Sequence, residues 1–156
     1  MKKQYILFSI LAVLVSCSEE AKNDPGISAI TPIEGTWKLL TGTIIEKGDT
    51  TITDYTKNKS FIKVINDSHF AFLLHDLSKG KDSASAAFSA GGGSYSLTGN
   101  NYTEHLEYCN AREWEGHDFS FTITFSGDTL IQSGVEKLEA QGINRINTEK
   151  YIRVKE

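Results

Sequence analysis

Apolar and polar residues alternate with a period of two along much of the chain after residue 35. In the segment 117–126, Phe121, Ile123 and Phe125 fall on one face and Ser120 and Thr122 on the other. Such alternation is typical of a strand with one buried and one wet face. The same pattern, punctuated by turn residues, predicts strands at 36–47, 50–57, 60–66, 68–76, 86–98, 101–109, 117–126, 129–138 and 150–155.

The segment 86–109 is the most informative of these, because Gly99-Asn100 predicts a two-residue hairpin turn. That turn determines the register of both strands, since side chains alternate between faces. Glu104 is then the only carboxylate on an otherwise apolar, aromatic face. Burying a carboxylate requires a raised pKa or a partner, which for Glu104 could be Tyr95 opposite, Lys63 or an arginine. The predicted pairs on this face are Leu97 with Tyr102, Tyr95 with Glu104, Gly93 with Leu106, and Gly91 with Tyr108.

Two features of the strands leave alternatives open. The hairpin around Asn66-Asp67 is apolar on both faces, so the pattern does not decide whether Lys63 or His69 faces the interior. The run Gly91-Gly92-Gly93 lies inside a strand, where glycine weakens the sheet. It either permits a sharp bend or leaves space for a ligand beside the sheet.

No segment has a clear helical period, and 77–85 and 139–149 are predicted to be irregular connections. Short antiparallel strands linked by hairpins favour a closed barrel, because closure removes exposed sheet edges. The predicted fold is therefore all-β, an antiparallel up-and-down β-barrel of about eight to ten strands.

The first 16 residues have the order of a signal peptide, with a basic start and then an apolar run. Leu14-Val15-Ser16-Cys17 resembles the lipobox of bacterial lipoproteins, which implies that Cys17 carries a lipid. Residues 17–33 are polar, contain both prolines and are predicted to form a tether. The folded domain is expected at 34–156, anchored in the cell envelope at the periplasmic or surface face of the outer membrane.

Gly35-Thr36-Trp37 resembles the G-x-W motif of the lipocalins and the wider calycin superfamily. In that superfamily the tryptophan closes one end of the barrel and a basic residue packs across it. The resemblance assigns these structural roles to Gly35, Trp37 and Arg153, with Arg145 as the alternative cation.

A closer resemblance is to the lipocalin-like domains of unknown function in bacterial lipoproteins. It is carried by the hairpin residues 91–97 (GGGSYSL) and 102–108 (YTEHLEY). This resemblance implies a fold and a location in the envelope. It implies no chemistry, because fold does not determine function.

The formal net charge of −4 and the absence of a basic, aromatic-rich cluster exclude nucleic acid as a predicted partner. The chain contains no G-x-S-x-G elbow and no phosphate-binding loop, so no cofactor is predicted. A metal site of His105 and Glu107 with His69 or His75 depends on folding alone, and no metal is predicted.

We expect a small amphipathic or hydrophobic molecule to bind in the barrel interior, without catalysis. The predicted ligand-binding residues are Tyr95, Tyr102, Glu104, Tyr108, Phe70, Phe72, Phe121, Ile123, Phe125 and Gln132. Two alternatives stay open. One is a lyase, isomerase or hydrolase that uses Glu104 or His105 as acid or base, and the other is a purely structural envelope protein.

Overall fold

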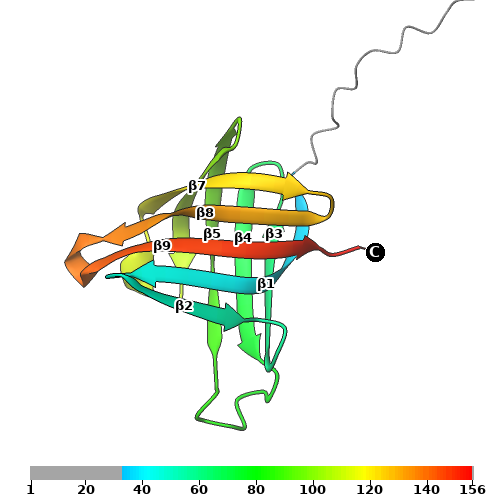
Figure 1. Cartoon of the computed structure of the whole chain (residues 1–156), viewed down its shortest axis with the longest axis vertical. Coiled ribbons are helices and arrows are strands. Elements are labelled where there is room, and N and C mark those ends of the chain that lie inside the picture. The colour runs from blue at the N-terminus through cyan, green and yellow to red at the C-terminus, as the bar shows by residue number, and fades with distance from the viewer. Residues whose placement is uncertain (1–32, 156) are drawn as a thin grey trace, which may run out of the picture. The chain divides into compact units, whose positions relative to one another are not determined.

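The computed structural model describes residues 33–155, in which the chain forms strands that run antiparallel around a barrel (Figure 1). The signal peptide, the lipobox and all but the last residue of the tether lie outside the described residues. The strands are β1 (Gly35–Glu46), β2 (Asp49–Asp54), β3 (Lys59–Ile65), β4 (His69–Asp76), β5 (Phe88–Thr98), β6 (Asn101–Cys109), β7 (His117–Ser126), β8 (Thr129–Leu138) and β9 (Ile143–Arg153).

The barrel closes because β1 pairs with β9 along its length, from Trp37 to Glu46. On its other edge β1 pairs with β3 through Gly35–Lys38 and with β2 through Thr41–Glu46. Each remaining strand pairs with the next along the chain. The result is a closed eight-stranded antiparallel barrel with up-and-down topology, and β2 continues the sheet beside β1. The predicted fold class is confirmed.

The register of the β5–β6 hairpin agrees with the prediction near its turn and departs from it further away. Tyr95 pairs with Glu104, and Gly93 pairs with Leu106, as the Gly99-Asn100 turn predicts. A β-bulge then shifts the register, so Gly92 pairs with Tyr108. The predicted pairing of Gly91 with Tyr108 is therefore wrong. One extra residue in a strand reverses the alternation that follows it.

The bulge is stabilised by Glu107, whose carboxylate accepts hydrogen bonds from the backbone N–H of Ser94 (3.1 Å) and from its hydroxyl (2.8 Å). The glycines opposite are required by close approach of the backbone. A Cβ on Gly93 would lie 2.0 Å from the carbonyl oxygen of His105, and one on Gly92 would lie 2.5 Å from that of Phe70. A Cβ on Gly91 would lie 2.6 Å from the ring of Phe72, so this position is also closely packed on that side. The three glycines in addition line a second pocket, beside Tyr108.

The β3–β4 hairpin buries the face that contains Lys63. Phe61, Lys63 and Ile65 are buried, whereas Val64 and Leu73 are 39% and 46% exposed on the outer face. The turn itself is Asp67-Ser68 rather than Asn66-Asp67, because the N–H of Asn66 donates to the carbonyl of His69. The inward position of Lys63 places an ammonium group inside the barrel.

Strand β9 begins at Ile143, so the prediction of an irregular connection over 139–149 is wrong. Only Glu139–Gln141 form a short 3₁₀ turn there. The inward-facing positions of this part of β9 include Asn147 and Glu149, which are polar. A search for alternating apolar residues cannot detect a strand whose inner face is polar.

Trp37 fills one end of the barrel and is completely buried. Its indole N–H donates to the carbonyl of Ile33 (2.7 Å), and the guanidinium carbon of Arg153 lies 4.1 Å from the ring centroid. Gly35 has φ +132°, and a Cβ there would lie 2.6 Å from Nη1 of Arg153. The glycine of the G-x-W motif therefore makes room for the cation that covers the tryptophan.

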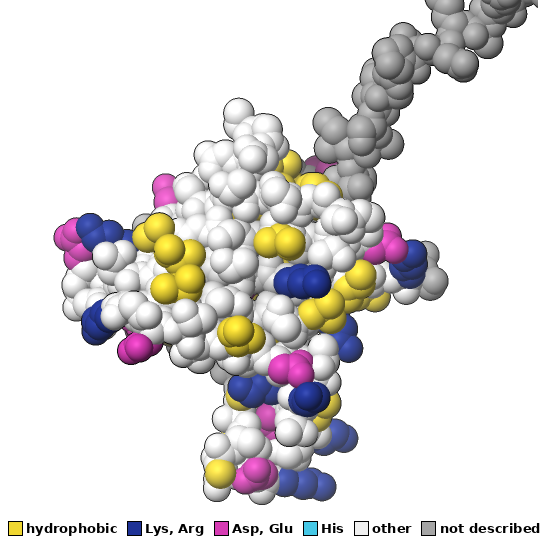
Figure 2. Space-filling model, in the orientation of Figure 1, with side chains coloured by type: hydrophobic (Ala, Val, Ile, Leu, Met, Phe, Trp, Pro, Cys, Tyr) yellow, Lys and Arg dark blue, Asp and Glu magenta, His cyan; other side chains and the backbone are white. Residues whose placement is uncertain are grey.

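The outer surface over β8, β9 and β1 carries apolar side chains in separate patches, with charged side chains between them (Figure 2). Small, separate apolar patches of this kind are normal on the surface of a folded protein. In residues 33–155, no helix has the length and hydropathy needed to cross a membrane.

Candidate ligand-binding cavity

The half of the barrel interior away from Trp37 contains a cavity of about 380 Å³. Every strand of the closed barrel contributes to its wall, and the 3₁₀ turn Arg112–Trp114 contributes Trp114. Its aromatic lining residues are Tyr55, Phe61, Phe72, Trp114, Phe119 and Phe121. Its charged and amide-bearing residues are Lys63, Glu104, Gln132, Glu136, Arg145, Asn147 and Glu149. A wall of this composition suits a molecule with both an apolar and a polar part.

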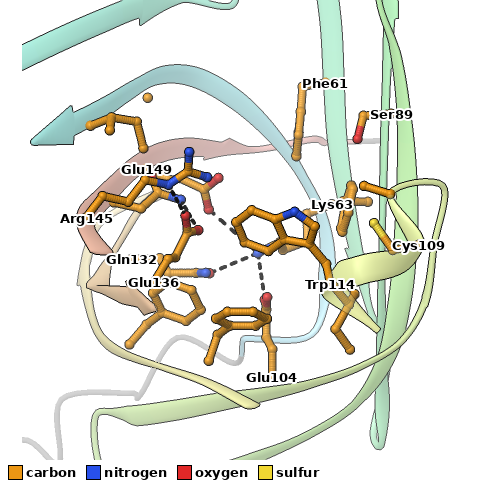
Figure 3. A pocket seen from close by; sticks show the side chains of 18 of the residues that line it. Phe61, Lys63, Ser89, Glu104, Cys109, Trp114, Gln132, Glu136, Arg145 and Glu149 are labelled. Atoms are coloured by element: carbon orange, nitrogen blue, oxygen red, sulfur yellow. Dashed lines mark hydrogen bonds and ion pairs between the residues drawn. The ribbon is translucent and has the colours of Figure 1, made fainter. Parts of the chain in front are cut away.

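Lys63 is the centre of the first polar cluster (Figure 3). Its ammonium group donates to Oε1 of Glu104 (2.7 Å) and to Oε1 of Gln132 (3.1 Å), and it lies 3.8 Å from Oε2 of Glu149. The Lys63 side chain is only 3% exposed. Lys63 is one of the partners that the sequence allows for Glu104. It reaches Glu104 because the face of β3 that carries Lys63 is the face that points into the barrel.

The pKa values in this cluster are shifted by burial and by the charges of neighbouring groups. Burial acts to lower the pKa of Lys63, but the carboxylates of Glu104 and Glu149 outweigh it, so the pKa is raised and the ammonium stays charged. Burial raises the pKa of Glu104, and the charge of Lys63 only partly offsets this shift. Burial also raises the pKa of Tyr151, whose hydroxyl donates to Oε2 of Glu149 (2.7 Å).

Arg145 and Glu136 form the second polar cluster. Nε of Arg145 lies 2.6 Å from one oxygen of Glu136, and the amide of Asn147 donates to the other oxygen (2.7 Å). The guanidinium carbon of Arg145 lies 5.2 Å from the ring centroid of Trp114. Arg145, the alternative cation for Trp37, is thus a residue of the cavity, and Arg153 is the one that covers Trp37.

Two buried polar atoms in residues 33–155 have no hydrogen-bond partner: the hydroxyl of Tyr102 and Nε2 of Gln132. Gln132 is 1% exposed and lines the cavity. Its amide orientation follows from Lys63, because an ammonium group can only donate and therefore faces the amide oxygen. The two N–H donors of Gln132 thus have no acceptor within residues 33–155.

The structure brings only part of the predicted ligand-binding set to this cavity, namely Glu104, Phe72, Phe121 and Gln132. Phe70, Tyr102 and Ile123 are buried in the core outside the cavity lining. Phe125 packs against Trp37, with ring centroids 6.0 Å apart, and Tyr95 packs against Tyr102 at 5.2 Å. These residues fill the end of the barrel that contains Trp37, so they are not available to the cavity.

The prediction that Tyr108 faces the interior is wrong, because its side chain is 68% exposed on the outer surface. The bulge in β6 turns Cys109 toward the cavity in its place. The bulge leaves no mark in the sequence that period-two alternation can detect, since the contact that stabilises it joins Glu107 to Ser94, which lies 13 positions earlier on the neighbouring strand.

His105 lies on the outer face of β6 and does not share the cavity with Glu104. Its side chain is 48% exposed, and its ring Nδ1 lies 2.6 Å from Oδ1 of Asp118 on β7. Adjacent residues of a strand point to opposite faces, which separates these two candidate acid–base groups. In residues 33–155, no three His, Cys, Asp or Glu side chains are grouped so that they could hold a metal ion.

Sequence reasoning missed most of the polar lining, including Glu136, Asn147 and Glu149. Glu136 lies on β8, which was predicted as a strand but not as part of the site. Asn147 and Glu149 lie in the part of β9 where polar side chains disguise the strand pattern. Trp114 was also missed, because it lies in a short 3₁₀ turn after β6 that no spacing signal announces. The available signal for the start of β9 was Gly142, a turn residue directly before Ile143.

The closed eight-stranded antiparallel barrel fits a lipocalin-like fold. No protein-family model matches the sequence, and no curated protein matches it either. Among solved structures, the chain is similar to an uncharacterized protein from Bacteroides eggerthii DSM 20697. The two share 10% sequence identity, with a TM-score of 0.47, over 78% of this chain and 98% of the other.

Proposed function

We propose that this protein binds one small amphipathic molecule in the barrel and does so as a carrier or receptor rather than as an enzyme. The observation that supports this proposal is the cavity of about 380 Å³ itself, with the Lys63 cluster and six aromatic side chains in its wall. Ligand pockets commonly begin at about 300 Å³ and combine apolar walls with a few polar groups. A barrel filled by its own side chains, as a purely structural role implies, has no such space.

A non-catalytic role is favoured because the candidate acid and base are both engaged. Glu104 is held by the ammonium of Lys63, and His105 is paired with Asp118 outside the barrel. A general acid or base must reach the reacting group within hydrogen-bond distance. His105 does not meet this condition for a molecule inside the cavity.

The experiment that tests ligand binding is native mass spectrometry of the full chain purified from its own host. We expect one small molecule per chain, which dissociates when the collision energy is raised. Ser89→Trp provides a variant that fills the cavity, because Ser89 is a small residue of its lining. Ser96→Trp, at an exposed position on the same strand, is the matched control and should retain the ligand.

Two results would contradict the proposal. One is a chain that carries no small molecule from its host and does not bind the uncharged fluorophore 1-aminoanthracene. The other is binding of 1-aminoanthracene that Ser89→Trp leaves unchanged while circular dichroism shows an intact fold, because the ligand would then lie elsewhere.

We further propose that the protein is a lipoprotein of the cell envelope, anchored to the outer membrane through Cys17. This part rests on the signal-like order of residues 1–16 and on the resemblance of 14–17 to a lipobox. Several acyl chains on one cysteine would anchor a protein firmly, at about 0.8 kcal/mol per buried methylene. The test is the intact mass of the protein from its host, together with the fraction in which Cys17→Ser is found. An unlipidated wild-type chain that is as soluble as the Cys17→Ser variant would contradict it.

A further inference from the structure

The charges that line the cavity do not balance. Three carboxylates line it, from Glu104, Glu136 and Glu149, whereas only two cations do, from Lys63 and Arg145. Arg145 is paired with Glu136, and Asn147 binds the other oxygen of the same carboxylate. Lys63 is therefore left with both Glu104 and Glu149. With all groups ionised, the Lys63 cluster carries a formal charge of −1.

Each of the two cations is already paired with a carboxylate of the cavity. The ammonium of Lys63 is directed at oxygens of Glu104, Gln132 and Glu149, and its side chain is 3% exposed. Arg145 has its Nε on Glu136 and its guanidinium near the ring of Trp114. The remaining guanidinium N–H groups of Arg145 can still donate, but the charge of Arg145 is already balanced by Glu136. An anionic group entering the cavity would therefore add to the excess negative charge of its lining.

Gln132 adds the second, independent observation. Its Nε2 is buried, lacks a partner within residues 33–155, and belongs to a side chain that lines the cavity. Two N–H donors therefore await an acceptor oxygen. The nearby carboxylate of Glu149 supplies acceptor capacity, since its Oε2 takes one hydrogen bond from Tyr151 and an oxygen can accept more than one.

We infer that the ligand carries an uncharged polar head that both accepts and donates hydrogen bonds, such as a primary carboxamide or a hydroxyl group. The head accepts from Nε2 of Gln132 and donates to the Glu104–Glu149 carboxylates. The apolar part of the ligand lies against the aromatic wall. Carboxylate, sulfonate and phosphate heads are selected against. The inference rests on the proposed function, because it names the class of ligand for the same cavity.

The experiment compares octanamide with octanoate, which share the chain and the carbonyl oxygen and differ in one NH₂ group and one charge. Both are titrated into the full chain at pH 7.5, where octanoate is ionised. Binding is measured by calorimetry and by tryptophan fluorescence, to which Trp114 in the cavity wall contributes. We expect octanamide to bind at least tenfold more tightly than octanoate.

Three variants separate the parts of the inference. Glu149→Gln removes the excess charge, so octanoate should gain affinity about tenfold, whereas octanamide should gain none because it loses a charged acceptor. Glu139→Gln makes the same change of net charge at a carboxylate that is 81% exposed outside the cavity, and neither affinity should change. Gln132→Leu removes the unpartnered donor and should weaken octanamide at least fivefold, with circular dichroism as the check of folding.

The outcomes distinguish failure of this inference from failure of the proposed function. Octanoate binding as tightly as octanamide would overturn the selection of an uncharged head and leave the ligand-binding function standing. An equal gain for octanoate in Glu149→Gln and Glu139→Gln would overturn the role of the cavity charge. Failure of both probes to bind, with no ligand from the host, would overturn the inference and the proposed function together.

Discussion

The ammonium of Lys63 lies 2.7 Å from Oε1 of Glu104 inside the barrel, and both side chains are at most 10% exposed. The two residues are 41 positions apart in the chain and come from β3 and β6, which are not neighbours in the barrel wall. The pair therefore spans the interior and links opposite parts of the sheet. The pair lies between the half of the barrel that is filled around Trp37 and the half that contains the cavity. It therefore matters both for the stability of the barrel and for the charge of the cavity wall.

Removal of Lys63 is expected to cost much more stability than neutralisation of Glu104. Lys63→Met leaves Glu104 and Glu149 without their shared cation, and an unpaired buried charge costs about 3–5 kcal/mol. Glu104→Gln leaves Lys63 beside Glu149 and Gln132, so the expected cost is about 1.5 kcal/mol. Urea unfolding of the full chain measures both. If both variants lowered the free energy of unfolding by the same amount, the result would contradict a cluster in which one cation is shared by two carboxylates.

Gly93→Ala is expected to destabilise the protein by about 1–3 kcal/mol or more, because overpacking forces the backbone to move. The new Cβ would lie 2.0 Å from the carbonyl oxygen of His105, which is fixed in the bulge of β6. Gly42→Ala is the matched control, since its Cβ would meet the side chain of Tyr55 at 3.1 Å. Thermal unfolding compares the two variants. A Gly93→Ala protein as stable as Gly42→Ala would show that the bulge is not held tightly.

Asp76 is expected to stabilise the loop after β4 in a pH-dependent manner. Its carboxylate accepts hydrogen bonds from the hydroxyl of Ser78 and the N–H groups of Gly80 and Ala87, which lower the pKa of Asp76. A carboxyl whose pKa is depressed in the folded state contributes stability above its unfolded pKa of about 3.9, and that contribution is lost as pH falls below it.

The test compares the melting temperatures of the wild-type chain and Asp76→Asn between pH 7 and pH 2. Asp76→Asn should melt lower at pH 7, and the gap should stay constant down to about pH 5 and then shrink. Asp49→Asn, at an exposed position at the start of β2, controls for a general loss of negative charge. If the difference in melting temperature between the wild-type chain and Asp76→Asn widened as pH falls, the result would contradict the role of Asp76.

Arg153→Met is expected to destabilise the protein by about 1–3 kcal/mol. It removes the cation over Trp37 and the hydrogen bond from the guanidinium to the carbonyl of Glu34 (2.7 Å). Arg112→Met is the control, because Arg112 forms an ion pair but its side chain is 82% exposed, and such pairs contribute less than about 1 kcal/mol. Chemical unfolding followed by Trp37 fluorescence gives both values. A cost for Arg153→Met no larger than that of the control would contradict the role of the cation.

The sequence by itself determined the barrel and the direction of its clearest side chains. Alternation in β7 and the two-residue turn at Gly99-Asn100 place Phe121 and Glu104 on the inner face, and local turn chemistry is enough for this. Because a bare buried carboxylate is unfavourable, the pattern also pointed to a site around Glu104 and to Lys63 among its partners.

Only the tertiary structure decided which half of the interior is filled and which is hollow. Strand alternation distinguishes inside from outside, but it does not tell how far an aromatic ring extends across a barrel. The rings of Phe125 and Tyr102 therefore pack near Trp37 or in the core, while those of Phe61 and Phe72 surround the cavity. The bulge that exposes Tyr108, and the polar inner face of β9, depend on contacts between residues far apart in the chain, which no local pattern encodes.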